Sequence, residues 1–340
     1  MIVSALLRGA AALLPVLLFL AALLYFDSFK VVRGRAVLQA ALAGMLAAFA
    51  CYWVNGVLLY GLQFDFAVYS RFVSPWLEEF AKAALMIYLI RTRRVGMIVD
   101  AAICGFAIGT GFALFENLYF LMMRPETHPA VQVIRGFGTA IMHGGATAVF
   151  AIVSVSLAER HPDGWLRVFG PGLLAAAILH GVYNTLLIRP AFATLAVLML
   201  LPPLIYFAFE HSEKTLRDWL ESDLDTDVQL LEAINSGEFA DTHAGRYLHS
   251  LQDRFSGAVL ADMLCYLRLH VELAMRAKGA LMLKESGFEE PPLDDDLRAQ
   301  IAELHYLERS LGKAGQLALR PLVMATGKDL WQLQWLAREH

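Results

Sequence analysis

Seven apolar stretches, each close to the length of a membrane-spanning helix of about 20 residues, occupy most of residues 1–210. Because the bilayer core offers no water to the backbone, such segments must cross it as helices. We therefore predict an all-α protein, a polytopic transmembrane helix bundle of about seven spans. The first stretch is expected to be retained, since its apolar run is long and shows no small-residue cleavage site. The predicted spans are Ile2–Phe26, Ala36–Tyr60, Phe72–Ile90, Met97–Met122, Phe137–Ala158, Leu166–Ile188 and Ala191–Phe209.

The charge balance of the chain changes at about residue 210. Residues 1–210 contain 14 Lys and Arg and 10 Asp and Glu, whereas residues 211–340 contain 14 and 22. This predicts a membrane-embedded domain at 1–210 and an acidic, soluble helical domain at 211–340, in which Val259–Leu283 is the clearest helix. A negative tail disfavours binding to nucleic acid or to an anionic lipid surface. The sequence indicates no particular partner for the tail.

Basic residues gather in the loops after the first, third and fifth predicted spans. The positive-inside rule places these loops in the cytoplasm. We therefore predict a multi-pass protein of the cell membrane, with its N-terminus outside and its C-terminal domain in the cytoplasm. An odd number of spans agrees with this orientation. The basic residues concerned are Lys30, Arg33, Arg35, Arg91, Arg93, Arg94, Arg160 and Arg167.

The third predicted span carries three ionisable side chains within five residues. Each costs about 2.5–3.5 kcal/mol at the centre of a membrane helix unless it finds partners or water inside a bundle. Lys82 follows Glu78 by four residues and Glu79 by three, so it can reach either carboxylate. A position in the headgroup layer is disfavoured, because the apolar run after Lys82 is too short to span alone. We interpret these residues as part of a functional site.

Polar side chains also interrupt the next three predicted spans, as Glu116, His143, His180 and Asn184. With the predicted orientation, all of them lie within about 12 Å of the outer surface at a rise of about 1.5 Å per residue. His180 and Asn184 share one helix face, as do Phe112 and Glu116. Helices of alternating direction thus bring polar groups to one depth, which indicates a common site.

These residues resemble the motifs of the PrsW family of intramembrane proteases, which belongs with the CAAX-prenyl-protease-like superfamily. The motifs are Glu-Glu-x-x-Lys at Glu78–Lys82, Phe-x-x-x-Glu at Phe112–Glu116, a single histidine at His143, and His-x-x-x-Asn at His180–Asn184. The CAAX enzymes have arginine and histidine where this chain has Lys82 and Glu116, so the pattern favours the PrsW side. The resemblance covers about residues 70–190 and leaves the acidic tail outside.

The resemblance implies an enzyme, an intramembrane endopeptidase that cleaves membrane-anchored proteins. The depth of the polar groups predicts a cut near the extracytoplasmic end of the substrate's membrane segment. Single-pass regulators such as anti-sigma factors are the expected substrate class. The resemblance assigns Glu78 as the general base that activates water. We expect Glu79 to pair with Lys82 and orient it.

The remaining polar residues have expected roles around the activated water. His143 and His180 would position the water or stabilise charge, and Asn184 would donate a hydrogen bond to the oxyanion. Glu116 would shuttle a proton or hold a histidine tautomer. Phe112 is a supporting residue on the same helix face as Glu116.

The same side chains leave two further questions open. Glu78, His143 and His180 could ligate a divalent metal such as zinc, which would activate the water instead. No His-Glu-x-x-His pair is present, and we favour catalysis by glutamate without a metal. A proton-coupled transporter would also place such residues in the membrane, but it would more often show broken helices and repeats. A non-catalytic signalling scaffold would tolerate substitution of Glu78 and His180.

Overall fold

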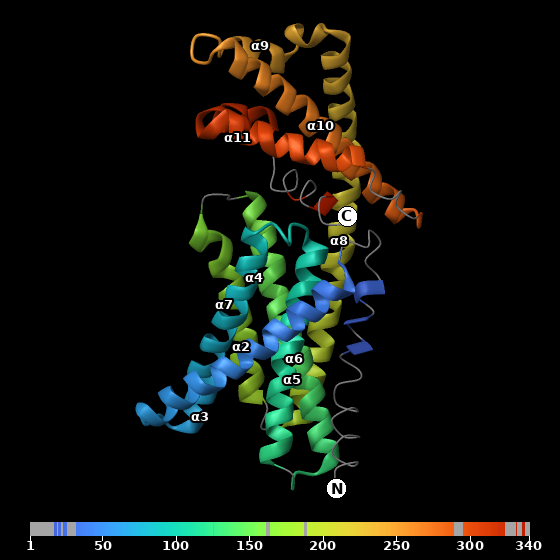
Figure 1. Cartoon of the computed structure of the whole chain (residues 1–340). Coiled ribbons are helices and arrows are strands. Elements are labelled where there is room, and N and C mark those ends of the chain that lie inside the picture. Colours follow the sequence, from blue (N-terminus) through green and yellow to red (C-terminus); the bar gives the residue numbers. More distant parts are fainter. Residues whose placement is uncertain are drawn as a thin grey trace. The chain divides into compact units, whose positions relative to one another are not determined.

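The regular structure of the chain is helical throughout the part that the computed structural model describes, with no strand (Figure 1). The chain forms two compact units, Met1–Glu213 and Lys214–His340, and each is considered by itself. The described residues are 32–124, 126–160, 164–186, 189–288 and 295–323, with a few more between 17 and 25 and between 331 and 336.

Four helices of the first unit are long and apolar enough to cross a membrane, among the residues described. The unit also contains α4 (Ser74–Arg91) and the shorter apolar segment Ala191–Phe207 at the start of α8 (Pro190–Ser236). The predicted first span lies mostly outside the described residues, so a total of seven stays a prediction. The four long helices are α2 (Gly34–Gly61), α5 (Ile98–Met123), α6 (Pro129–Arg160) and α7 (Trp165–Leu186).

At two of the predicted spans the observed α-helix starts at a different residue. Helix α6 begins at Pro129, eight residues before the predicted Phe137. Proline favours the first turn of a helix, and the polar side chain of Gln132 is satisfied there because its amide donates to the carbonyl oxygen of Arg124 at 3.1 Å. The predicted start of the third span at Phe72 lies within a π-helical turn, η1 (Tyr69–Val73), which precedes α4.

Helix α5 lies at the centre of the first unit, and α6 runs beside it along its length (Figure 1). Small residues allow this close approach. A Cβ atom on Gly109 would lie only 2.0 Å from the carbonyl oxygen of His143 in α6. On another face of α5, a Cβ on Gly111 would lie 1.8 Å from the carbonyl oxygen of Ala41 in α2. The backbones of α2, α5 and α6 are therefore in direct contact, which fixes the height of His143 relative to α5.

We expect Gly109→Ala to damage both stability and activity. The new methyl group would push the backbone at His143 away from α5, at a cost of about 1–3 kcal/mol. A displacement of about 1 Å in a catalytic group can lower turnover about 10²-fold. Thermal unfolding in detergent and proteolytic turnover measure the two effects. Gly61→Ala is the matched control, because a Cβ there meets nothing within 4 Å. Wild-type turnover by Gly109→Ala would contradict this packing.

The second unit consists of four helices and a short 3₁₀ turn in the described residues. The predicted helix at Val259–Leu283 is confirmed as α10 (Gly257–Glu285), which packs against α11 (Asp295–Val323). Helix α8 continues past residue 210 to Ser236, so the predicted domain boundary falls within a helix. The remaining elements are η2 (Glu238–Asp241) and α9 (His243–His249).

The ammonium group of Lys278 is held inside the second unit. The residue is 1% exposed, and Nζ donates to Oδ2 of Asp227 in α8 at 2.7 Å. A buried amine requires such a partner, since an unpaired charge away from water is costly. This ion pair ties α10 to the end of α8 within the unit.

Candidate active site

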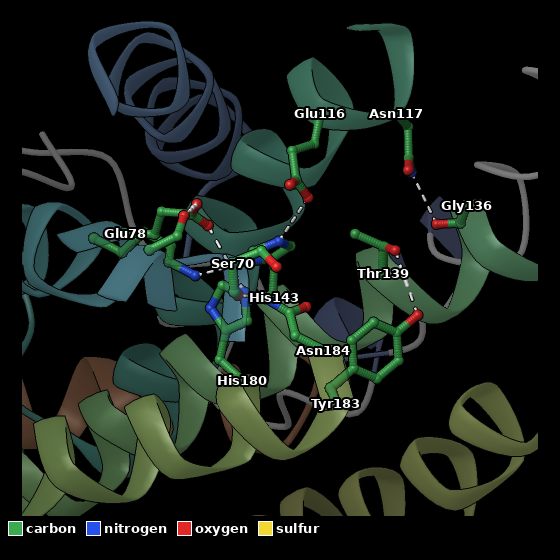
Figure 2. A network of polar contacts seen from close by, with 12 residues as sticks. Ser70, Glu78, Glu116, Asn117, Gly136, Thr139, His143, His180, Tyr183 and Asn184 are labelled. Atoms are coloured by element: carbon green, nitrogen blue, oxygen red, sulfur yellow. Dashed lines mark hydrogen bonds and ion pairs between the residues drawn. The ribbon is translucent and has the colours of Figure 1, made fainter. Parts of the chain in front are cut away.

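Six ionisable side chains from four helices of the first unit converge at one place. Figure 2 shows those of Glu78, Glu116, His143 and His180 pointing toward one another. All but one of these side chains are at most 9% exposed, whereas the side chain of Glu116 is 36% exposed. Groups of this kind are retained inside a membrane domain when they pair with each other and have a function. The six are Glu78, Glu79 and Lys82 from α4, Glu116 from α5, His143 from α6 and His180 from α7.

Five of these side chains form a continuous chain of hydrogen bonds. Oε1 of Glu79 accepts from Nζ of Lys82 at 2.5 Å and lies 2.8 Å from Nδ1 of His180. Nζ of Lys82 lies 2.8 Å from Nδ1 of His143. Nε2 of His143 lies 2.9 Å from Oε2 of Glu116. The chain thus links α7, α4, α6 and α5.

The charged partners of the two histidines fix their tautomers. The ionised Glu79 can only accept, so Nδ1 of His180 donates to it and Nε2 of the neutral ring keeps its lone pair. Lys82 can only donate, so Nδ1 of His143 accepts and Nε2–H donates to Glu116. Glu79 and Glu116 therefore each contact one histidine in one tautomer, while the role of Glu116, as a proton shuttle or as the holder of a tautomer, stays a prediction.

The carboxylate of Glu78 lies beside this series of hydrogen-bonded side chains. Its Oε2 is buried and has no hydrogen-bond partner among the described residues, and it lies 3.8 Å from Nε2 of His180. Its Oε1 accepts from Oγ of Ser74 at 2.5 Å and from Nδ2 of Asn55 at 3.2 Å. A buried acceptor without a partner is costly, so this oxygen marks the place where a water or a ligand would bind.

Aromatic packing closes one side of the cluster. The ring of Phe112 lies 5.1 Å from that of His143, and Nζ of Lys82 lies 4.8 Å from the Phe112 centroid. The two histidine rings meet edge to face at 4.7 Å. Phe112 itself is 2% exposed, so this side excludes water. Exclusion of water strengthens the electrostatic interactions among the charged groups.

The side-chain amide of Asn184 is held by the backbone of the segment before α4. The residue lies one turn beyond His180, and its Nδ2 donates to the carbonyl oxygen of Ser70 at 2.9 Å. That carbonyl belongs to the π-helical turn η1, so Asn184 ties α7 to the segment that leads into α4. The amide nitrogen carries a second hydrogen, and its role as an oxyanion donor stays a prediction.

Three residues near Glu78 escaped the sequence analysis. They are Ser74, Asn55 and Tyr69, whose hydroxyl donates to Oδ1 of Asn55 at 2.7 Å. Ser74 had a signal, since it precedes Glu78 by four residues and so shares its helix face. Asn55 also had one, as an uncharged polar residue in a largely apolar span. The sequence could not show that α2 places Asn55 beside α4.

A group of three side chains could hold a metal ion, because one donor atom each from Glu78, His143 and His180 lie within 4.8 Å of one another. Two imidazoles and one carboxylate suit catalytic zinc. Oε2 of Glu78 and Nε2 of His180 fit directly. His143 fits only after a change, since one ring nitrogen contacts Lys82 and the other Glu116. Glu79 would support the ligand His180 from its Nδ1 side.

An apolar helix bundle with a buried set of acid–base groups fits an enzyme that works within the membrane. Comparison with protein families then identifies the kind of enzyme. A family model described as PrsW family intramembrane metalloprotease matches residues 33–208, and the chain belongs to this family. The chain is therefore an intramembrane protease, a peptide hydrolase, which confirms the resemblance seen in the sequence. No curated protein and no solved structure gives a match.

Proposed function

We propose that this protein hydrolyses a peptide bond of a membrane-anchored substrate with a water activated by Glu78. The observation that carries the proposal is the pair of acceptors formed by Oε2 of Glu78 and Nε2 of His180, 3.8 Å apart. Oε2 is buried and has no hydrogen-bond partner within the described part of the chain. A water between these atoms would donate a hydrogen to each, and this would turn its lone pair toward a substrate carbonyl.

The chemical step then needs three actions from this chain. Oε2 of Glu78 accepts a proton as the water oxygen bonds to the carbonyl carbon. The second N–H of Asn184 donates to the developing oxyanion. Glu78 then returns the proton to the leaving amine as the carbon–nitrogen bond breaks, which gives a carboxylic acid and an amine.

The hydrogen-bonded side chains beside Glu78 hold the water and the base in position for this step. Glu79 holds Nδ1 of His180, so the imidazole presents Nε2 to the water. Lys82 offsets the charge of Glu79 and fixes His143. The arrangement is set before substrate binds, so little reorganisation is needed during reaction.

A divalent ion on Glu78, His143 and His180 would supply Lewis-acid activation of the water. We favour the metal-free reaction, because both ring nitrogens of His143 already contact other side chains. The purified protein is expected to keep its activity after exhaustive chelation and to contain far less than one zinc per chain by plasma mass spectrometry. The metal-free reaction would be contradicted if chelation abolished the activity and zinc restored it. It would also have to follow that His143→Ala lowers the zinc content, whereas His249→Ala, a control at an exposed residue, does not.

We further propose the orientation given by the basic loops, with the C-terminal unit in the cytoplasm and the cluster in the outer half of the bilayer. The cut then falls near the extracytoplasmic end of the substrate's membrane segment. Single-pass regulators, of the anti-sigma-factor kind, are the proposed substrate class. A comparison of membrane-protein fragments in cells with the wild-type chain or Glu78→Gln tests the function. Fragments that appear with the wild-type chain and not with Glu78→Gln would support the proposed proteolysis. Identical sets of fragments in the two kinds of cell would exclude it.

A further inference from the structure

The two oxygens of the Glu78 carboxylate have different surroundings. Oε1 accepts two hydrogen bonds, from Oγ of Ser74 at 2.5 Å and from Nδ2 of Asn55 at 3.2 Å. Oε2 has none in the described residues and lies 3.8 Å from Nε2 of His180. A carboxylate held by one oxygen cannot rotate freely, so the other oxygen keeps a constant direction.

The amide of Asn55 is itself oriented by a third residue. The hydroxyl of Tyr69 donates to Oδ1 of Asn55 at 2.7 Å, and the tyrosine is 3% exposed. Because Oδ1 accepts that bond, the NH₂ group of the amide must face Glu78. A flipped amide would place Oδ1 against the carboxylate of Glu78, which can only accept, so the bond to Glu78 selects this orientation and leaves Oδ1 to accept from the hydroxyl of Tyr69.

These residues come from parts of the chain that neither the family motifs nor the ionisable cluster includes. Asn55 lies in α2, and Tyr69 begins the π-helical turn η1. Isolated π-helical turns are rare and occur often at functional sites. The carbonyl of Ser70 in the same turn is held by Asn184 of α7. The turn is therefore connected to the site by two side-chain bonds.

We propose that Tyr69 and Asn55 are positioning residues that act in series on Glu78, with Ser74 as a second support of the same oxygen. This inference rests on the proposed function, in which Oε2 of Glu78 accepts the proton of the water. Tyr69 orients Asn55, and Asn55 holds Oε1, so that Oε2 stays directed at the space beside His180. The series makes a prediction that a merely structural role would not make: the effects of Tyr69 and Asn55 are not multiplicative.

The test is a double-mutant cycle on turnover of a single-pass substrate by the full-length protein in vesicles. Loss of a hydrogen bond to a charged group predicts that Asn55→Ala lowers kcat about 10–100-fold, with KM changed less than about twofold. Tyr69→Phe removes one neutral hydrogen bond and is expected to lower kcat about 2–10-fold. The double variant should be no slower than Asn55→Ala alone. Tyr60→Phe, which removes a hydroxyl from a side chain of α2 that is 81% exposed, is the control and should match wild type.

The outcomes separate this inference from the proposed function. Full turnover by Glu78→Gln would overturn the function and the inference together. An inactive Glu78→Gln with a wild-type kcat for Asn55→Ala would overturn the positioning role alone. If the decreases in kcat caused by Tyr69→Phe and Asn55→Ala multiply in the double variant, Tyr69 does not act through Asn55. If Asn55→Ala fails to fold, the turnover of Tyr69→Phe is the remaining test. An unchanged kcat in that variant would overturn the proposal that Tyr69 orients Asn55.

Discussion

Glu78→Gln is expected to lower peptide hydrolysis by about 10²–10⁴-fold, the contribution of a positioned general base. Glutamine has the size of glutamate and can still accept from Ser74 and Asn55, so the fold and the hydrogen bonds to Oε1 remain. The loss is confined to the proton-accepting oxygen beside His180. The measurement is turnover of a single-pass substrate by purified protein in vesicles.

The control for this variant removes a carboxylate of the same type outside the site. Glu126 lies exposed between α5 and α6, and Glu126→Gln should keep wild-type turnover. Substrate binding by Glu78→Gln should stay within about threefold of wild type, since the lost interaction acts in the transition state. A slow variant that has also lost its substrate or its fold would not support a role as base.

Lys82→Met is expected to be the most destabilising single change in the cluster. Lys82 is fully buried, and its ammonium group lies between Glu79 and His143. Methionine fills a similar volume but leaves the carboxylate of Glu79 without its cation. Breaking a buried ion pair in this way costs about 3–5 kcal/mol of unfolding free energy. Unfolding in mixed detergent micelles, followed by circular dichroism, measures the change.

The double variant Glu79→Gln/Lys82→Met separates this cause from simple loss of packing. It removes both charges, so it should be more stable than Lys82→Met although it carries one change more. Arg91→Met, at the exposed end of the same helix, should stay within about 0.5 kcal/mol of wild type. A double variant less stable than Lys82→Met would show that the charge of Glu79 is compensated by another group.

The sequence was most informative where hydropathy and helix periodicity act directly. The all-helical class follows from apolar stretches of bilayer length, and the family follows from motifs whose spacing puts pairs such as His180 and Asn184 on one helix face. The boundaries were harder to predict. Helix α6 extends back to Pro129, where the side-chain amide of Gln132 donates to the carbonyl oxygen of Arg124 in the preceding segment, a contact that hydropathy does not reveal.

The site was predictable only as a set of residues at one depth. Spacing allowed Lys82 to reach either carboxylate, and the structure selects Glu79 at 2.5 Å. The pairing of His143 with Glu116 crosses from α6 to α5 and depends on the height that Gly109 permits. Asn55 was missed because its partner lies on another helix, and no periodicity relates α2 to α4.

Cleavage in ¹⁸O-labelled water tests whether a water activated by Glu78 hydrolyses the peptide bond. A single-pass substrate is incubated in vesicles with the wild-type protein or with Glu78→Gln, and mass spectrometry identifies the new ends. With the wild type we predict one ¹⁸O atom in the new carboxyl terminus, at a bond near the extracytoplasmic end of the membrane segment. With Glu78→Gln we predict about 10²–10⁴-fold less of this product. The same labelled fragment at the same rate from both proteins would contradict this role of Glu78.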